Sequence, residues 1–81
     1  MSRVSIMALV FDERTRQEAL KSAGKFKHTC ADDIPRADKA IILGEEYGEV
    51  CRAICENDTA NLHDELVQVM AICLAWLESL D

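Results

Sequence analysis

The sequence predicts an all-α fold, in which three helices form a helical hairpin protomer that completes a four-helix-bundle-like core by homodimerisation. Two observations support the helical class. Apolar residues recur at helical spacing, and no segment shows the strict alternation of a half-buried strand. Residues that typically begin or end helices stand between the apolar segments. With 81 residues, 49% of them hydrophobic, the chain is predicted to form a single helical domain over 1–81.

The first helix is predicted over residues 2–23. Ile6, Leu9 and Val10 lie on one side of it, whereas residues 12–18 are strongly charged and should face solvent. Gly24 stands where a residue in the left-handed conformation commonly ends a helix. Residues 25–34 are polar and irregular, and we expect a loop there.

The second helix is predicted to run from Pro35 to about residue 56. Asp32 and Asp33 offer side chains that cap a helix, and proline is favoured in the first turn. A polar break follows, and the third helix then continues to about residue 80. The break consists of Asn57, Asp58, Thr59 and Asn61.

Two features of the chain predict association of two or four copies. A domain this short buries only about 60% of the surface that its unfolded chain exposes, so a partner is an economical source of extra core. The third helix is apolar on nearly every side over residues 66–77, and such a helix must be covered all round. One hairpin cannot provide that cover, whereas a dimer can.

The formal net charge of −6 argues against a nucleic-acid polymer as partner, because such proteins present a basic surface to phosphates. Lys21, Lys25 and Lys27 cluster around Gly24, and either a small polyphosphate or plain solvent would satisfy them. No apolar segment approaches the roughly 20 residues that span a bilayer, so no membrane partner is expected. Four cysteines without a secretory segment predict a reduced, cytoplasmic protein.

Acidic side chains interrupt the apolar faces of the second and third helices. Glu46 and Glu49 are three residues apart and therefore lie on the same side of a helix, as do Glu65 and Gln68. Burying several carboxylates together is costly unless a cation neutralises them, and oxygen ligands suit Mg²⁺. The alternative is that these glutamates reach water at the rim of the helix contact, or pair with Lys39 and Arg36.

Segments 44–50 (GEEYGEV) and 64–69 (DELVQV) resemble the MazG-like, all-α nucleoside triphosphate pyrophosphohydrolase family. That family carries Glu-x-x-Glu on one helix and Glu-x-x-Asp on the next, and these four acids hold Mg²⁺. The resemblance matches Glu46, Glu49 and Glu65 to three of the acids and places Gln68 where the aspartate stands. It implies Mg²⁺-dependent, or Mn²⁺-dependent, hydrolysis of a nucleoside triphosphate to a monophosphate and pyrophosphate.

The resemblance also implies roles for individual residues. Glu49 and Gln68 are candidates for orienting the attacking water, in addition to contacting the metal. Because glutamine lacks a negative charge, the alternative is a catalytically weak or inactive helical dimer that binds nucleotide or metal. The candidates for binding substrate are Lys39, Lys25 and Lys27 on the phosphates and Phe26 on the base. Trp76 and Tyr47 are aromatic too, but their spacing favours the core.

The other residues of the second helix have simpler interpretations. Glu45, Arg52 and Glu56 share a side and predict an ordinary solvated edge. Gly44 and Gly48 cost helix stability, so they suggest close approach of a backbone or a ligand.

A zinc site can be drawn from four residues, but their spacing matches no usual structural zinc site, and buried free cysteine is the commoner state. These residues are His28, Cys30, Cys51 and Cys55.

Overall fold

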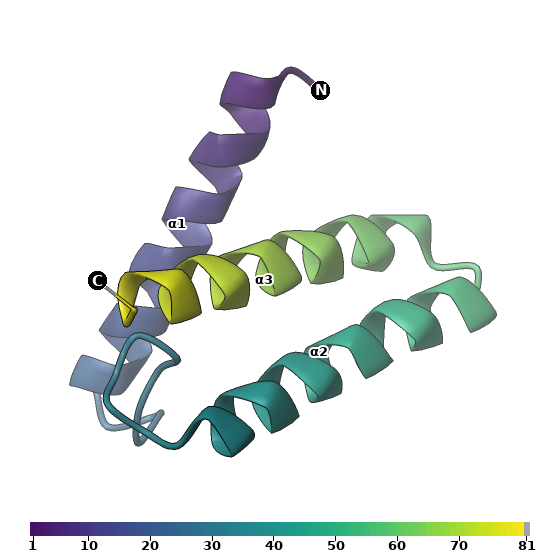
Figure 1. The fold of residues 1–81 in the computed structure, drawn as a ribbon. Helices are drawn as coiled ribbons and strands as arrows, with labels where there is room; N and C mark the ends of the chain where they lie inside the picture. The colour runs from purple at the N-terminus through teal and green to yellow at the C-terminus, as the bar shows by residue number, and fades with distance from the viewer. Residues whose placement is uncertain (81) are drawn as a thin grey trace.

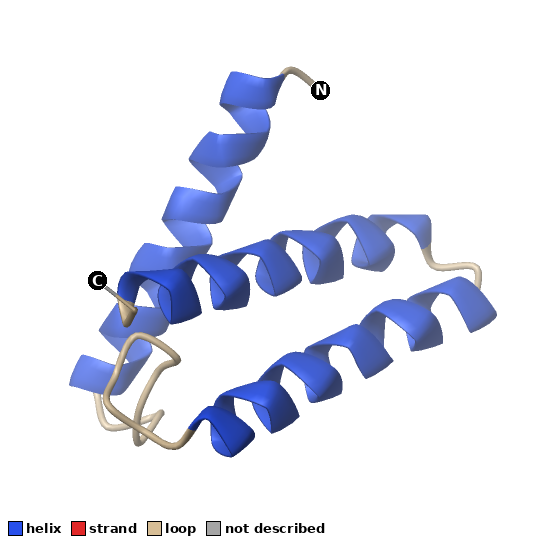
Figure 2. Cartoon of the chain, in the orientation of Figure 1, coloured by secondary structure: helices blue, strands red, loops and turns tan. Residues whose placement is uncertain are grey.

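The computed structural model describes residues 1–80 and confirms the all-α prediction. Its three helices are α1 (Arg3–Ser22), α2 (Arg36–Cys55) and α3 (Thr59–Glu78) (Figure 1). Within residues 1–80 there is no β-strand, and loops join the helices (Figure 2). None of the helices in this part of the chain is long and apolar enough to cross a membrane.

The ends of α1 follow the sequence signals. The Ser2 side chain caps the helix by accepting a hydrogen bond of 3.1 Å from the Ser5 amide. Gly24 has a φ of 77°, as expected for a residue that ends a helix in the left-handed region. The predicted bounds of 2–23 were therefore correct to within one residue at each end.

The start of α2 differs from the prediction. Pro35 is the N-cap residue, and no side chain caps the helix, so the capping role predicted for Asp32 and Asp33 was wrong. The Asp32 carboxylate instead accepts hydrogen bonds from the Thr29 amide (2.8 Å) and from Lys21 Nζ (2.6 Å). These contacts tie the loop to the end of α1.

The turn between α2 and α3 is shorter than the predicted break, because Thr59 and Asn61 lie in the first turn of α3. Asn57 adopts a φ of 54°, a region that asparagine tolerates better than most residues. The Asp58 side chain then caps α3 by accepting a 3.0 Å hydrogen bond from the Asn61 amide. This turn reverses the chain, and α2 and α3 form the predicted antiparallel hairpin (Figure 1).

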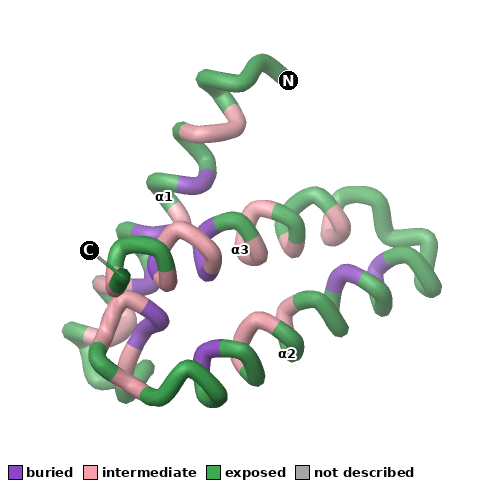
Figure 3. The backbone as a smooth tube through the Cα atoms, in the orientation of Figure 1, coloured by how far each residue is buried: buried purple, intermediate pink, exposed green. Residues whose placement is uncertain are grey.

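Helix α3 lies between the other two helices. Among the described residues, α1 and α2 each pack against α3 but not against each other. A small core around Cys30, Ile72 and Ala75 forms where α2, α3 and the loop meet. The N-terminal half of α1 extends away from the hairpin and is largely exposed (Figures 1 and 3).

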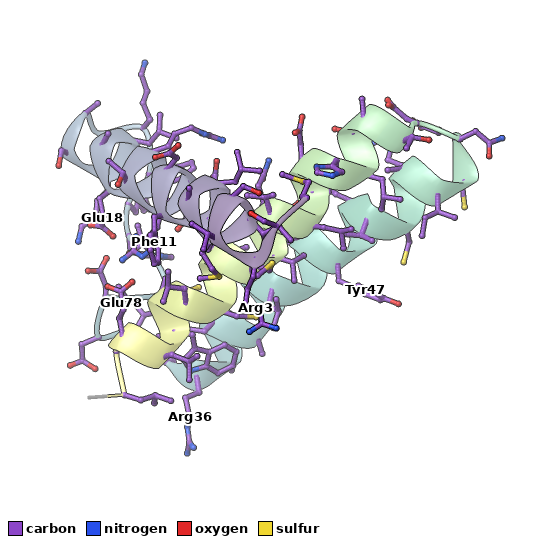
Figure 4. The ribbon with its side chains drawn as sticks, turned by 90° about the horizontal axis from the view of Figure 1, so that it is seen from above. Arg3, Phe11, Glu18, Arg36, Tyr47 and Glu78 are labelled. Carbon is purple, nitrogen blue, oxygen red and sulfur yellow. The ribbon has the colours of Figure 1, made fainter. Side chains whose placement is uncertain are left out.

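A buried arginine joins α1 to the end of α3. Arg14 is only 9% exposed; it pairs with Glu18 on its own helix, and its Nε lies 3.0 Å from Oε1 of Glu78. Figure 4 shows Glu18 and Glu78 on the same side of the molecule. Burial alone would lower the pKa of Arg14, yet its two carboxylate partners hold that pKa above its ordinary value.

The outer face of α2 corrects two expectations. Tyr47, predicted for the core, is 60% exposed and points away from the helices (Figure 4). Gly44 and Gly48 are exposed too, and a Cβ atom at either position would meet no atom within 4 Å. No backbone in the described part of the protomer therefore approaches these glycines closely, and the approach of a ligand stays a prediction.

Candidate functional site

A cleft of about 340 Å³ lies where α1, the 23–35 loop, α2 and α3 converge, and we call it the acidic cleft. Part of its lining, which we call the floor, is apolar and is formed by the core residues Ile42 and Ile72. The other lining residues, which form the walls, are mostly polar, and four of these residues are glutamates. The lining residues are Glu13, Arg16, Gln17, Phe26, His28, Thr29, Cys30, Ile42, Glu45, Glu46, Glu49, Gln68 and Ile72.

The acidic charge of the cleft is only partly neutralised. Arg16 on the α1 wall is paired with Glu13, with 3.0 Å between Nε and Oε1. Glu49 is exposed and has a looser contact of 3.7 Å with Arg52. Glu45 and Glu46 have no ion-pair partner within residues 1–80. The α2 wall therefore presents net negative charge to whatever enters.

Two polar atoms of the lining are buried without a hydrogen-bond partner. They are Oε2 of Glu46, on α2, and Nδ1 of His28, on the loop. Buried polar atoms in folded proteins are nearly always hydrogen-bonded, so each such exception needs an explanation. The buried Oε2 atom of Glu46 can therefore accept a hydrogen bond from a ligand or bind a cation.

The loop wall of the cleft is firmly held. The Thr29 hydroxyl donates a 2.8 Å hydrogen bond to Glu18, which lowers the pKa of that carboxyl together with the nearby Arg14. Cys30, the next residue, is 4% exposed, and burial raises the pKa of its thiol. A buried thiol of raised pKa is a poor nucleophile, so Cys30 serves the core.

The structure brings together four of the residues that the sequence singled out. Glu46, Glu49 and Gln68 line the same cleft as Phe26, whose side chain is 42% exposed and offers an aromatic face. Glu65 is half-buried on α3 and does not line the cleft. In residues 1–80, no three acidic, histidine or cysteine side chains approach closely enough to hold a metal ion.

The lysines suggested for substrate binding lie elsewhere. Lys39 is 4% exposed, and its Nζ donates a 2.6 Å hydrogen bond to the Ser79 hydroxyl just after α3. Lys25 and Lys27 are exposed on the loop and are not part of the cleft lining. The cationic residue that does line it is Arg16.

The residues drawn as a zinc site are separated. His28 and Cys30 line the acidic cleft, whereas Cys51 and Cys55 are exposed on α2 and do not. Within residues 1–80, these four side chains therefore do not form a group that could hold a metal ion.

Sequence reasoning missed part of the cleft. Glu45 was expected on a solvated edge, which Arg52 and Glu56 do form with a 3.2 Å contact, but Glu45 also lines the cleft. Glu13 and Arg16 were regarded only as charged surface of α1. Helical spacing could not place them, because it does not reveal how α1 crosses the hairpin.

The geometry offers an acidic, half-open pocket with an apolar floor, an aromatic side chain and an unpaired carboxylate oxygen. Such a pocket suits a ligand that brings positive charge or hydrogen-bond donors to the α2 wall. Comparison of the chain with protein-family models, curated proteins and solved structures found no match.

Proposed function

We propose that the chain is a Mg²⁺-dependent nucleoside triphosphate pyrophosphohydrolase whose substrate binds in the acidic cleft. One observation carries the proposal: the buried, unpartnered Oε2 of Glu46 lies in a cleft shared with Glu49, Gln68 and Phe26. These are residues of the acidic motif and an aromatic side chain suited to a base. Mn²⁺ has the same ligand preference and is the expected substitute.

A divalent cation would neutralise the negative charge of the cleft and so allow a triphosphate to bind. Without one, the Glu45, Glu46 and Glu49 carboxylates would repel a triphosphate. Oxygen ligands are those that Mg²⁺ prefers, and the bound ion would neutralise charge on the phosphate oxygens. Glu46 and Glu49 would hold it directly, with the Gln68 amide oxygen as a weaker ligand. The proposal requires Glu65 to turn towards Glu46 when the ion binds.

The proposed reaction is attack of water on the α-phosphorus. A new P–O bond forms to the water oxygen, the bond to the α,β-bridging oxygen breaks, and pyrophosphate leaves with that oxygen. Glu49 is exposed at the mouth of the cleft and can accept the proton that the water loses. Phe26 would stack on the base, and Arg16 would contact the phosphates in place of the distant lysines.

The experiment is pyrophosphate release from a panel of ribo-, deoxyribo- and modified nucleoside triphosphates with Mg²⁺ or Mn²⁺. We expect Gln68→Asp to raise activity, since it restores a fourth acid. Glu49→Gln should lower kcat/KM by about 100-fold or more, as expected for loss of a general base. Glu56→Gln is the matched control, because Glu56 is the C-cap residue of the same helix, lies outside the cleft and pairs with Arg52. Absence of release from every nucleotide would refute the hydrolase.

The second candidate is a nucleotide-binding or metal-binding module without turnover. Gln68 in place of an acid favours it, because a neutral amide binds Mg²⁺ more weakly. In that case nucleotide and Mg²⁺ should raise the melting temperature without releasing pyrophosphate. An unchanged melting temperature would exclude this module as well.

Homodimerisation is part of the proposal, either as a dimer that completes a four-helix core or as a pair of such dimers. It is supported by apolar residues that the protomer leaves exposed on α3, among them Leu66, Met70 and Leu77.

A further inference from the structure

Helix α3 carries an uncharged stripe that the protomer leaves uncovered. Its residues are spaced four, three, four and three positions apart, which is the heptad spacing of helices that pack along a seam. The exposed fractions are 47% for Leu66, 40% for Met70, 62% for Leu77 and 64% for Leu80, which is the second residue after the helix. Cys73 is half-buried at the centre of the stripe. We call these five residues the α3 seam.

The N-terminal half of α1 extends the uncovered surface. An apolar notch of about 190 Å³ separates this half of α1 from the first part of the α3 seam. A helix lying on the seam would therefore contact α1 as well, where α1 extends beyond the hairpin (Figure 1). The apolar residues on the two sides of the notch are Met1, Ile6, Leu9, Leu66, Val67 and Met70.

The exposed area matches what a second copy would cover. The protomer has 5613 Å² of accessible surface, whereas a compact monomer of its 9.1 kDa mass is expected to have about 4,900 Å². The excess is about 700 Å², close to the roughly 800 Å² that each partner contributes to a standard interface. The radius of gyration of 12.9 Å likewise exceeds the roughly 11.7 Å expected for this length.

The distribution of charge favours the α3 seam as the surface on which a second copy docks. Each copy has a formal charge of −6, so most ways of apposing two copies would bring carboxylates together. The α3 seam contains no charged residue, and an apolar seam is complementary to itself about a two-fold axis. The outer face of α2 also exposes apolar side chains, Ile41, Tyr47 and Ile54, but Gly44, Gly48 and Cys51 lie between them, so this face has no unbroken row of large apolar residues.

We infer that a second copy of this chain docks on the α3 seam, with the two α3 helices packed together and each α1 arm covering its partner. The inference names the surface of the proposed homodimer, and it does not depend on the chemistry of the acidic cleft. Cys73, central in the seam, lies next to Cys73 of the other copy in this arrangement.

The first test measures mass in solution by sedimentation over a range of protein concentrations. We expect the wild type to have twice the chain mass and Leu66→Glu/Leu77→Glu to raise the dissociation constant at least 100-fold. The matched control is Ile41→Glu/Ile54→Glu on the outer face of α2, where the two side chains are 59% and 58% exposed. This control should remain dimeric. All four side chains are exposed in the protomer, so neither variant places charge in its core.

The second test uses the native cysteines and needs no charged substitution. A Cys51→Ser/Cys55→Ser variant keeps Cys73 and should form a covalent dimer under a mild oxidant. A Cys55→Ser/Cys73→Ser variant keeps the exposed Cys51 and should not. Cys30 is retained in both because it is 4% exposed in the core. If Leu66→Glu/Leu77→Glu loses its helical circular dichroism signal, the variant has unfolded, and the cross-linking result alone tests whether the α3 seam is the interface.

The outcomes separate the inference from the proposals on which it builds. A monomeric wild type at every concentration would overturn both the seam and the homodimer. A dimer that survives Leu66→Glu/Leu77→Glu, or that cross-links through Cys51 alone, would overturn the seam and leave the homodimer standing. Failure of pyrophosphate release would affect only the proposed chemistry.

Discussion

Glu46 is the residue in which stability and function conflict most clearly. Its Oε2 atom is buried without a hydrogen-bond partner, and Glu45 adds a neighbouring carboxylate in the same cleft. Leaving a buried polar oxygen unsatisfied costs free energy of folding, commonly about 1–3 kcal/mol. Costs of this kind persist at sites where a ligand supplies the missing partner.

Glu46→Gln should therefore stabilise the protein in the absence of a cation. We expect the free energy of unfolding to rise by about 1 kcal/mol, because the substitution removes the buried charge while keeping the shape of the side chain. The melting temperature should then rise by about 4–8 °C for a chain of this size. Any stabilisation of the wild type by Mg²⁺ should disappear in the variant. Thermal melts with and without Mg²⁺ measure both effects.

Glu56→Gln is the control for Glu46→Gln, since Glu56 is exposed and paired with Arg52. It should leave the melting temperature nearly unchanged. A Glu46→Gln variant that melts below the wild type without Mg²⁺ would contradict the account of Glu46 as an unsatisfied group.

Sequence predicted the acidic motif better than it predicted the surroundings of the motif. The i, i+3 spacing placed Glu46 and Glu49 on one side of a helix, and Gln68 does share their cleft, but Glu65 does not line it. The position of Lys39 was not foreseeable in this way. Its side chain reaches Ser79, forty residues along the chain, and only the folded hairpin brings the two together.

At the scale of the elements, the helices followed local chemistry, whereas the loop of residues 23–35 did not. The spacing of apolar residues and the residues that begin and end helices predicted three helices, because both depend only on residues that are close in sequence. The role of Asp32 depends instead on a partner from α1. Its hydrogen bond with Lys21, and a second from the Thr29 amide, hold the pKa of the Asp32 carboxyl below its ordinary value of 3.8.

The pH dependence of stability should show the contribution of Asp32. A carboxyl whose pKa is lower in the folded state stabilises the protein above its unfolded pKa, and this stabilisation is lost as pH falls through the folded pKa. Asp32→Asn should lower the free energy of unfolding by about 1 kcal/mol at pH 7. The difference from the wild type should shrink below pH 3.8 as the wild-type carboxyl takes up its proton. Thermal melts between pH 2 and pH 7 measure it.

Asp33→Asn provides the matched control for the loop, since Asp33 is exposed and adjacent in sequence. Its effect should stay within about 0.5 kcal/mol at every pH. A constant difference between Asp32→Asn and the wild type across this pH range would show that the carboxylate charge is not what ties the loop to α1.

At the scale of the whole molecule, the arrangement of α1 is the feature that sequence could not provide. A short turn dictates that α2 and α3 are antiparallel neighbours, but the longer loop of residues 23–35 leaves the crossing of α1 undetermined. That crossing creates the α1 wall of the acidic cleft, with Glu13 and Arg16, and leaves the N-terminal half of α1 exposed. One hairpin does leave apolar side chains of α3 exposed, as the apolar character of that helix predicted.

The salt dependence of association should reveal what kind of interface covers α3. Two copies with a charge of −6 each repel one another at long range, and added salt screens that repulsion. An interface held by ion pairs would weaken as salt rises, whereas one formed by the uncharged α3 seam should strengthen. We therefore expect the dissociation constant of the dimer to fall severalfold between about 20 mM and 300 mM sodium chloride, measured by sedimentation. Ile41→Glu/Ile54→Glu adds four charges to the dimer away from the seam, so its dissociation constant should fall more steeply than that of the wild type. A dissociation constant that rises with salt would place ion pairs at the interface and exclude the seam as its main contact.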